Sequence, residues 1–346
     1  MTVPAPRDPL PAGGAPMPVG EYLDFIAKEY LAGFVGRGGS TVKLMVVGGG
    51  QAAAELADGL AMIGDGFLHV TIDAAVTRVH MVDQVFATVA RQIDWGTLAA
   101  AVVGQAYERA GFPAPAHDPD GAKDLHDAGG LAVGVVAEHH EVDAHELYRS
   151  VRRSLEHAVL AAAGLGHDFR VAMYRLCCDL LGRGDLDDAE RDAVLGWLRG
   201  DRVPAAALRR VGLSAKVARH NARPLLVSLT RWLRRAGWSG LVLTLDLERV
   251  AQARRPPAGL RDGHYYSKAA TLDAYEVLRQ LIDGTDDLEG LFVAVLVPPE
   301  LVTDEARGLP AYSALQLRVA DEVRDRRRPN PFAALVRLGV RLEAVR

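Results

Sequence analysis

Short apolar runs recur at four places along the chain. They lie at residues 42–47, 67–72, 241–245 and 291–297. Such runs are typical of strands that are buried on both faces of a parallel sheet. The first run leads through Gly48-Gly49-Gly50 into residues 51–62, which are rich in Ala and Leu and favour a helix. The order strand, glycine turn, helix, strand predicts a βαβ unit, which requires parallel strands.

Most of the chain between the second and third runs follows a helical period instead. We therefore predict an α/β protein whose parallel sheet is flanked by helices and carries a large helical insertion. The predicted boundaries are a disordered tail over 1–19, the first part of the sheet domain over 20–96, the insertion over 97–235 and the remainder over 236–346.

Another helix is predicted from Glu21 onward, before the first strand. Its apolar residues recur at α-helical spacing and are Leu23, Ile26, Tyr30, Leu31 and Phe34. The glycine-rich turn over 36–40 ends this helix and leads into the first strand.

Composition excludes several classes of protein. The chain is 49% hydrophobic and 24% charged, and its formal net charge is −4, so no global basic field favours nucleic acid. A local contact with DNA stays open. The two cysteines, Cys177 and Cys178, are neighbours and cannot join distant segments, which indicates a reducing compartment. We expect a cytoplasmic protein, since neither a signal peptide nor a membrane-spanning run is apparent.

The glycine turn is the most informative local feature, because a strand followed by such a turn and a helix start favours an anion. Residues 48–53 fit the dinucleotide pattern G-x-G-x-x-A, and Asp73 ends the next strand at the distance expected for a ribose contact. A P-loop, G-x-x-x-x-G-K-[ST], fits poorly, because Ala54 stands for the lysine and Glu55 for the Ser or Thr. A tight turn without any ligand is the third interpretation.

Several segments resemble the ATP-binding proteins of bacteriophage-exclusion (BREX) defence systems, and they occur in the order of that family. They are residues 38–44, the W-L-R-G run at 197–200, the G-W-S-G-L run at 237–241 with Asp246, residues 274–283 and 308–318, and Asn330-Pro331. The resemblance implies a P-loop NTPase fold related to AAA+ and STAND ATPases, with Walker A at residues 48–55 and Walker B ending at Asp246.

The chain departs from the family's pattern at both Walker motifs. The lysine and the Ser or Thr of Walker A are missing, and Leu247 replaces the glutamate that should follow Asp246. Glu248 lies one residue later, and alternation along a strand would turn it away from the site unless the strand ends first. The resemblance implies nucleotide-binding roles for five residues and Mg²⁺ binding by Asp246 if a nucleotide binds. The five are Gly48, Gly49, Gly50, Asp246 and Arg318.

Three functional hypotheses follow. The first is a degenerate ATPase-like subunit of an anti-phage defence system, with weak ATP and Mg²⁺ binding or none required. It would scaffold or regulate a partner such as an ATPase, helicase or modification enzyme, in a homo- or hetero-oligomer and without a membrane. The second is an active ATPase in which Lys43 or an arginine reaches the phosphates and Asp246 and Glu248 are catalytic. The third is a dinucleotide-binding protein that uses the glycine turn.

Overall fold

The computed structural model describes residues 16–115, 128–252, 254–320 and 329–339. The chain divides into two compact units, one formed by Met1–Val85 with Ser239–Arg346 and the other by Phe86–Trp238. Of the tail predicted over 1–19, residues 1–15 lie outside the described residues, while Met17–Pro18 form strand β1.

The first unit contains a sheet in which every pair of neighbouring strands is parallel. Its strands are β1 (Met17–Pro18), β2 (Ser40–Val47), β3 (Phe67–Asp73), β4 (Gly240–Asp246), β5 (Leu291–Val297) and β6 (Leu335–Gly339). They are arranged in the order β1-β6-β2-β5-β4-β3. The α/β class predicted from the apolar runs is thus confirmed. Strands β1 and β6 were not predicted, since one is very short and the other less uniformly apolar.

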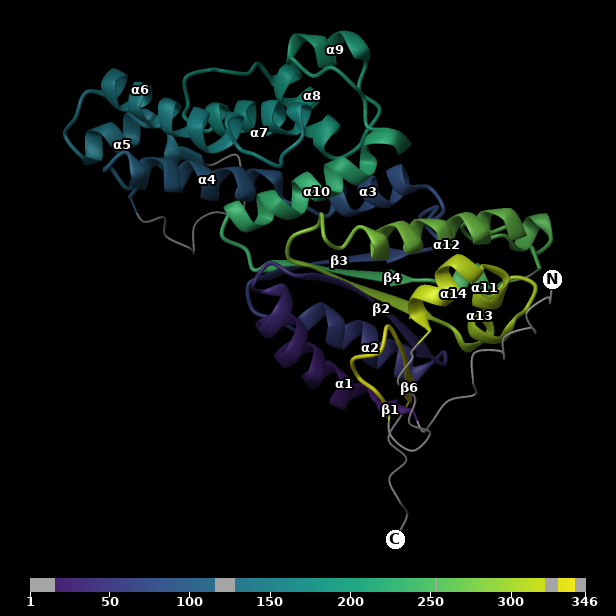
Figure 1. Ribbon diagram of the computed structural model, residues 1–346. Coiled ribbons are helices and arrows are strands. Elements are labelled where there is room, and N and C mark those ends of the chain that lie inside the picture. Colours follow the sequence, from purple (N-terminus) through teal and green to yellow (C-terminus); the bar gives the residue numbers. More distant parts are fainter. Residues whose placement is uncertain (1–15, 116–127, 253, 321–328, 340–346) are drawn as a thin grey trace, which may run out of the picture. The chain divides into compact units, whose positions relative to one another are not determined.

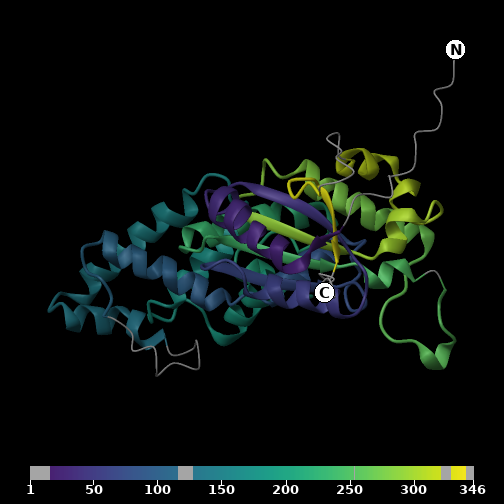
Figure 2. The ribbon, with the colours of Figure 1, turned by 90° about the horizontal axis from the view of Figure 1, so that it is seen from below.

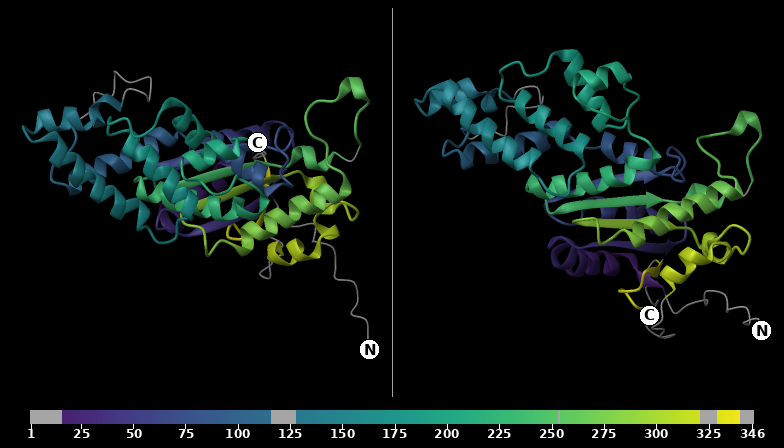
Figure 3. Two further views of the ribbon diagram at one scale, coloured as in Figure 1. Left: turned by 90° about the horizontal axis from the view of Figure 1, so that it is seen from above. Right: turned by 45° about the horizontal axis from the view of Figure 1, so that its top comes forward.

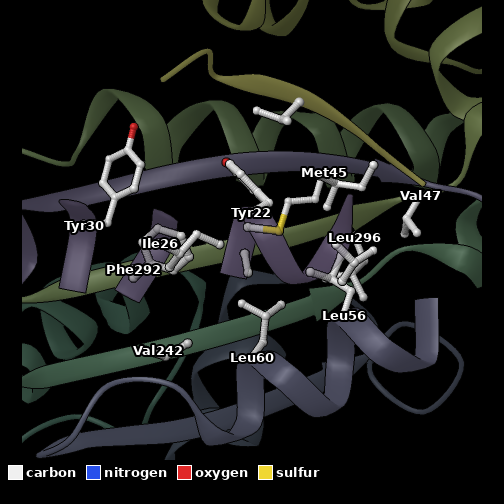
Figure 4. Close-up of a cluster of buried hydrophobic side chains, with 14 of the residues drawn as sticks. Tyr22, Ile26, Tyr30, Met45, Val47, Leu56, Leu60, Val242, Phe292 and Leu296 are labelled. Carbon is white, nitrogen blue, oxygen red and sulfur yellow. The ribbon is translucent and has the colours of Figure 1, made fainter. Parts of the chain in front are cut away.

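One face of the sheet is covered by three helical segments, as Figures 1 and 2 show. They are α1 (Val19–Phe25), the π-helix η1 (Ile26–Val35) and α2 (Gln51–Met62). Their apolar side chains meet those of β2, β4 and β5 in a buried core (Figure 4) that includes Tyr22, Leu56, Met45, Val242 and Phe292. This contact fixes the start of α2 at the end of β2.

The helix expected from Glu21 changes its period part of the way along. In η1 the backbone hydrogen bonds join residues five positions apart, as in the 2.8 Å bond from the Gly36 amide to the Leu31 carbonyl. The wider turn moves the buried position from Phe34 to Val35, which leaves Phe34 50% exposed. A prediction based on the α-helical period could not anticipate this shift.

The opposite face of the sheet carries α12 (Lys268–Asp283), which crosses it in Figures 1 and 3. Ser267 caps this helix by accepting a bond from the Ala270 amide at 3.2 Å. The other helical segments of this half of the unit are α11 (Glu248–Ala251), η4 (Ala258–Leu260), α13 (Pro299–Thr303), η5 (Leu309–Ala311) and α14 (Ser313–Val319). Helices α11 and α13 lie directly beyond the carboxyl ends of β4 and β5.

The second unit is helical in its described residues. After α3 (Val82–Arg91), which begins in the first unit, come α4 (Trp95–Arg109), η2 (Ala128–Leu131), α5 (Val133–His139), α6 (Ala144–Leu155), η3 (Glu156–Leu160), α7 (His167–Asp179), α8 (Asp188–Leu198), α9 (Ala205–Arg210) and α10 (Arg219–Arg235). Edge-to-face contacts of Phe169 with Trp95 and Trp232, with ring centres 6.1 Å apart in both cases, tie α7 to α4 and α10.

None of the helices among the described residues has both the length and the apolar content needed to cross a bilayer.

Candidate functional site

The strand order brings the ends of three central strands together. β5 lies between β2, which leads into the glycine turn, and β4, which ends at Asp246. In open parallel sheets, ligands bind beyond the carboxyl ends of the strands. The glycine turn, Asp246 and the end of β5 therefore share the edge at which a ligand site is expected.

The glycine turn is short, since only Gly48-Gly49-Gly50 separate β2 from α2. Gly50 adopts φ 79° and ψ −138°, a conformation that is nearly restricted to glycine. Gly48 and Gly49 have no such constraint, and a Cβ at either position would meet nothing within 4 Å. The fold itself requires glycine only at Gly50, so the other two leave room for close approach to the start of α2.

A cavity of about 390 Å³ opens at this edge. Its walls come from the glycine turn and α2, the end of β4 with α11, and the end of β5 with α13. The lining residues are Val47, Gly49, Ala53, Asp246, Glu248, Ala251, Gln252, Leu296, Pro298 and Glu300. The structure thus brings the predicted residues Gly49, Asp246 and Glu248 together, with Gly48 and Gly50 in the same turn.

Glu248 lines the same cavity as Asp246 because β4 ends at Asp246 and α11 begins at Glu248. Leu247 between them turns inward and is 1% exposed. Alternation along a strand therefore does not apply to this pair.

Asp246 is half-buried, and its surroundings shift the pKa of its carboxyl group. Burial raises the pKa of its carboxyl group, and the negative charges of Asp73 and Glu248 raise it further. The Glu248 amide donates to Oδ1 of Asp246 at 2.8 Å, which acts in the opposite direction. The net shift makes the ionised carboxylate costlier to maintain than in water.

The charged lining of the cavity is entirely acidic. Among the residues that the structure describes, it consists of Asp246, Glu248 and Glu300, and none of the described Lys or Arg residues belongs to the lining. Within the described ranges, no three His, Cys, Asp or Glu side chains approach closely enough to hold a metal ion. A triphosphate that bound here without Mg²⁺ would face carboxylates, which repel it.

Lys43 does not reach this cavity. Its side chain lies on the α1 side of the sheet and is 5% exposed. Its ammonium group donates to the carbonyls of Phe332 at 2.6 Å and Ala333 at 3.0 Å, and lies 4.7 Å from the centre of the Tyr30 ring. The hypothesis that Lys43 grips phosphate is therefore wrong.

The two residues at the positions expected for the Walker A lysine and its Ser or Thr also lie outside the cavity lining. Ala54 and Glu55 are exposed on α2, and a Cβ at Gly20 of α1 would lie 3.9 Å from Oε1 of Glu55. Ala53 is the residue of α2 that lines the cavity. The glycine turn leads directly into α2, which starts at Gln51.

Arg318, on α14, is not brought together with the other predicted residues. Its guanidinium binds Asp283 of α12, with Nη2 2.7 Å from Oδ2, and Nη1 donates to the Ala314 carbonyl at 2.7 Å. The residue does not line the cavity. An exposed ion pair that joins two helices accounts for its position.

The strand order contradicts the ribose role that the dinucleotide hypothesis gives to Asp73. In the standard dinucleotide-binding order the second strand lies beside the first. Here β5 and β4 separate β3 from β2, which puts Asp73 about 14 Å from the glycine turn across the sheet, at about 4.8 Å per strand. Asp73 instead accepts a bond from the Ala75 amide at 2.6 Å. It cannot hold a ribose bound at the start of α2.

The loop that follows α11 is fastened to the loop after β3 by a buried tyrosine. The Tyr266 hydroxyl lies 2.8 Å from the Ala74 carbonyl and 2.7 Å from the Thr77 carbonyl, and it accepts from the Val79 amide at 3.2 Å. Burial raises the pKa of this hydroxyl. Tyr266 therefore helps to fix the chain that leaves the cavity wall.

Glu300, Gln252 and Ala251 belong to the cavity although the sequence did not single them out. A signal was available for Glu300, since it closely follows a predicted strand that ends at the same edge of the sheet as Asp246. For Gln252 and Ala251 no signal existed, because the short helix α11 has no recognisable pattern.

The strand order and the cavity at the ends of β2, β4 and β5 define a P-loop NTPase-like α/β protein. The family model described as BREX system ATP-binding protein BrxC/D matches residues 130–343, and the chain belongs to this family. The match includes Asp246 and Glu248 but not the glycine turn. No curated protein and no solved structure matches the chain significantly.

Proposed function

We propose that this protein is a degenerate ATPase-like subunit of a BREX defence system that scaffolds or regulates another component, such as an ATPase, helicase or modification enzyme. The observation that carries the proposal is that every charged side chain among the described residues lining the cavity at the glycine turn is acidic. Family membership supports the assignment to a BREX system.

The missing cation has a definable cost. A lysine that binds phosphate contributes a charge-assisted hydrogen bond worth about 1.5–3 kcal/mol. Its loss alone lowers affinity about ten- to a hundredfold. Each lining carboxylate adds repulsion, which at 4 Å amounts to about 4 kcal/mol at intermediate dielectric. These terms favour very weak binding of free ATP and negligible turnover.

Two variants of α2 test the electrostatic argument. Ala53→Lys puts an ammonium group into the cavity wall, and Ala54→Lys adds the same charge to the same helix outside the lining. We expect isothermal titration with ATP and Mg²⁺ to show little or no binding by the unaltered protein. Ala53→Lys should gain about ten- to a hundredfold in affinity, and Ala54→Lys should gain much less. Equal gains would mean that the cavity is not the ATP site.

A phosphate-release assay tests the lack of turnover. Robust ATP hydrolysis by the unaltered protein that is abolished by Asp246→Asn would overturn the proposal.

A second candidate, an active ATPase, is favoured by one observation, the shared cavity position of Asp246 and Glu248. In that case Glu248 would orient the attacking water, and a partner would have to supply the missing cation. Hydrolysis that appears only with a partner and is lost in Glu248→Gln would support this candidate.

A further inference from the structure

Charge is strongly segregated along the second unit. Residues 199–235 contain ten Arg or Lys residues and a single acidic residue, Asp201. Residues 138–192 contain seven basic and twelve acidic residues. In a chain with a net charge of −4, this separation concentrates positive charge on the segment that runs from the end of α8 through α9 and α10.

Side-chain hydrogen bonds hold the loop between α9 and α10 in place. The Trp197 indole donates to the Ala215 carbonyl at 2.7 Å. The carboxylate of Asp168, on α7, accepts from the Ala215 amide at 3.0 Å and from the Ser214 hydroxyl at 2.9 Å. The loop is thereby tied to both α7 and α8.

The start of α10 is fixed to the same loop. The Asn221 amide group donates to the Lys216 carbonyl at 2.9 Å and accepts from the Ala218 amide at 2.8 Å. Figures 1 and 3 show α8, α9 and the first turns of α10 beside this loop in the helical unit. The basic side chains therefore project from an ordered scaffold, which lowers the entropy lost when they bind.

Several of these cations are exposed and lack an acidic partner. Arg199, Arg202, Arg209 and Lys216 are exposed, and none of them forms an ion pair with a described residue. Arg210 differs, because it pairs with Asp187 at 3.0 Å. We call the first four residues the basic surface of the helical unit.

The character of this surface favours nucleic acid over protein. Binding sites for proteins depend on desolvated apolar anchors. No large apolar side chain between residues 199 and 235 is exposed, although seven are exposed elsewhere among the described residues. Arginine-rich polar surfaces suit phosphate oxygens, which guanidinium groups can bind in pairs.

We propose that the basic surface of the helical unit binds the phosphate backbone of double-stranded DNA without reading its sequence. Each contact would release condensed counterions, so affinity should fall steeply with salt. This binding does not depend on the nucleotide cavity of the first unit.

The test measures fluorescence anisotropy of a labelled mixed-sequence duplex with the full chain over a range of salt concentrations. The variant Arg202→Ala/Arg209→Ala removes two cations of the basic surface. Its matched control, Arg149→Ala/Arg153→Ala, removes two exposed cations from α6. We expect the first variant to lose about 60-fold in affinity at 0.1 M salt and to lower the logarithmic salt slope by about 1.8, while the control changes little. Circular dichroism checks that both variants fold.

Three outcomes would overturn the proposal. The unaltered chain could fail to bind the duplex at low salt, or the two variants could weaken binding equally. Poly-L-glutamate could also bind as tightly as DNA with the same dependence on Arg202 and Arg209, which would indicate an acidic protein partner instead.

Discussion

Gly50 gives the sharpest test of the glycine turn, because at this position backbone strain can be separated from steric clash. Its φ of 79° and ψ of −138° are strained for any residue with a Cβ. A methyl group there would contact nothing within 4 Å, so Gly50→Ala adds backbone strain without a steric clash. Gly49→Ala is the matched control, since Gly49 is neither crowded nor at positive φ.

The expected magnitude follows from these conformations. Strain of this kind costs about 1–3 kcal/mol. Both substitutions also reduce the entropy of the unfolded chain, which stabilises each variant by about 0.4–1 kcal/mol. That gain cancels when the variants are compared, so Gly50→Ala should be less stable than Gly49→Ala by about 1–3 kcal/mol.

Urea denaturation followed by far-UV circular dichroism measures this difference. Equal stability of the two variants would refute the conformation assigned to Gly50. It would also remove the reason for distinguishing a glycine required by the fold from two that leave room for a ligand.

Three further predictions concern the cavity and its supports. Burial raises the pKa of Asp246, so its carboxyl group lowers the stability of the fold as pH rises above the ordinary pKa of 3.8. Asp246→Asn should therefore be more stable than the unaltered protein at neutral pH. Thermal unfolding should show that this gain vanishes well below pH 3.8. Tyr266→Phe should lose about 1–3 kcal/mol in urea denaturation, because buried backbone groups lose their partner, whereas Tyr265→Phe, at a partly exposed position, should lose less; a larger loss for Tyr265→Phe would contradict this. Lys43→Met should cost about 1–3 kcal/mol by leaving two carbonyls unpaired, and unchanged stability would show that those bonds contribute nothing.

Uniformly apolar segments were the most predictable part of the fold. Residues 42–47, 67–72, 241–245 and 291–297 all lie in strands, and residues 51–62 form α2 as predicted. These elements can be predicted because local features determine them, either a run of apolar residues or a composition that strongly favours a helix. Elements decided by distant partners were missed, such as β6, which pairs with β2.

Helix boundaries inside long helical stretches were less predictable. The helical period predicted after the second apolar run does not reveal that α3 ends at Arg91 and that Asp94 caps α4 by accepting from the Thr97 amide at 3.1 Å. Such a cap depends on a single side-chain hydrogen bond, which the spacing of apolar residues does not indicate.

The sequence by itself determined the α/β class, the glycine turn at the end of the first central strand, and the lack of any Lys or Arg in residues 48–62. Only the tertiary structure decided which strands are neighbours, and hence that Asp246, Glu248 and Glu300 surround one cavity while Asp73 and Lys43 lie elsewhere. The reason is physical. Local patterns fix whether a segment is buried, but strand order depends on packing between segments far apart in the chain, which no single segment encodes.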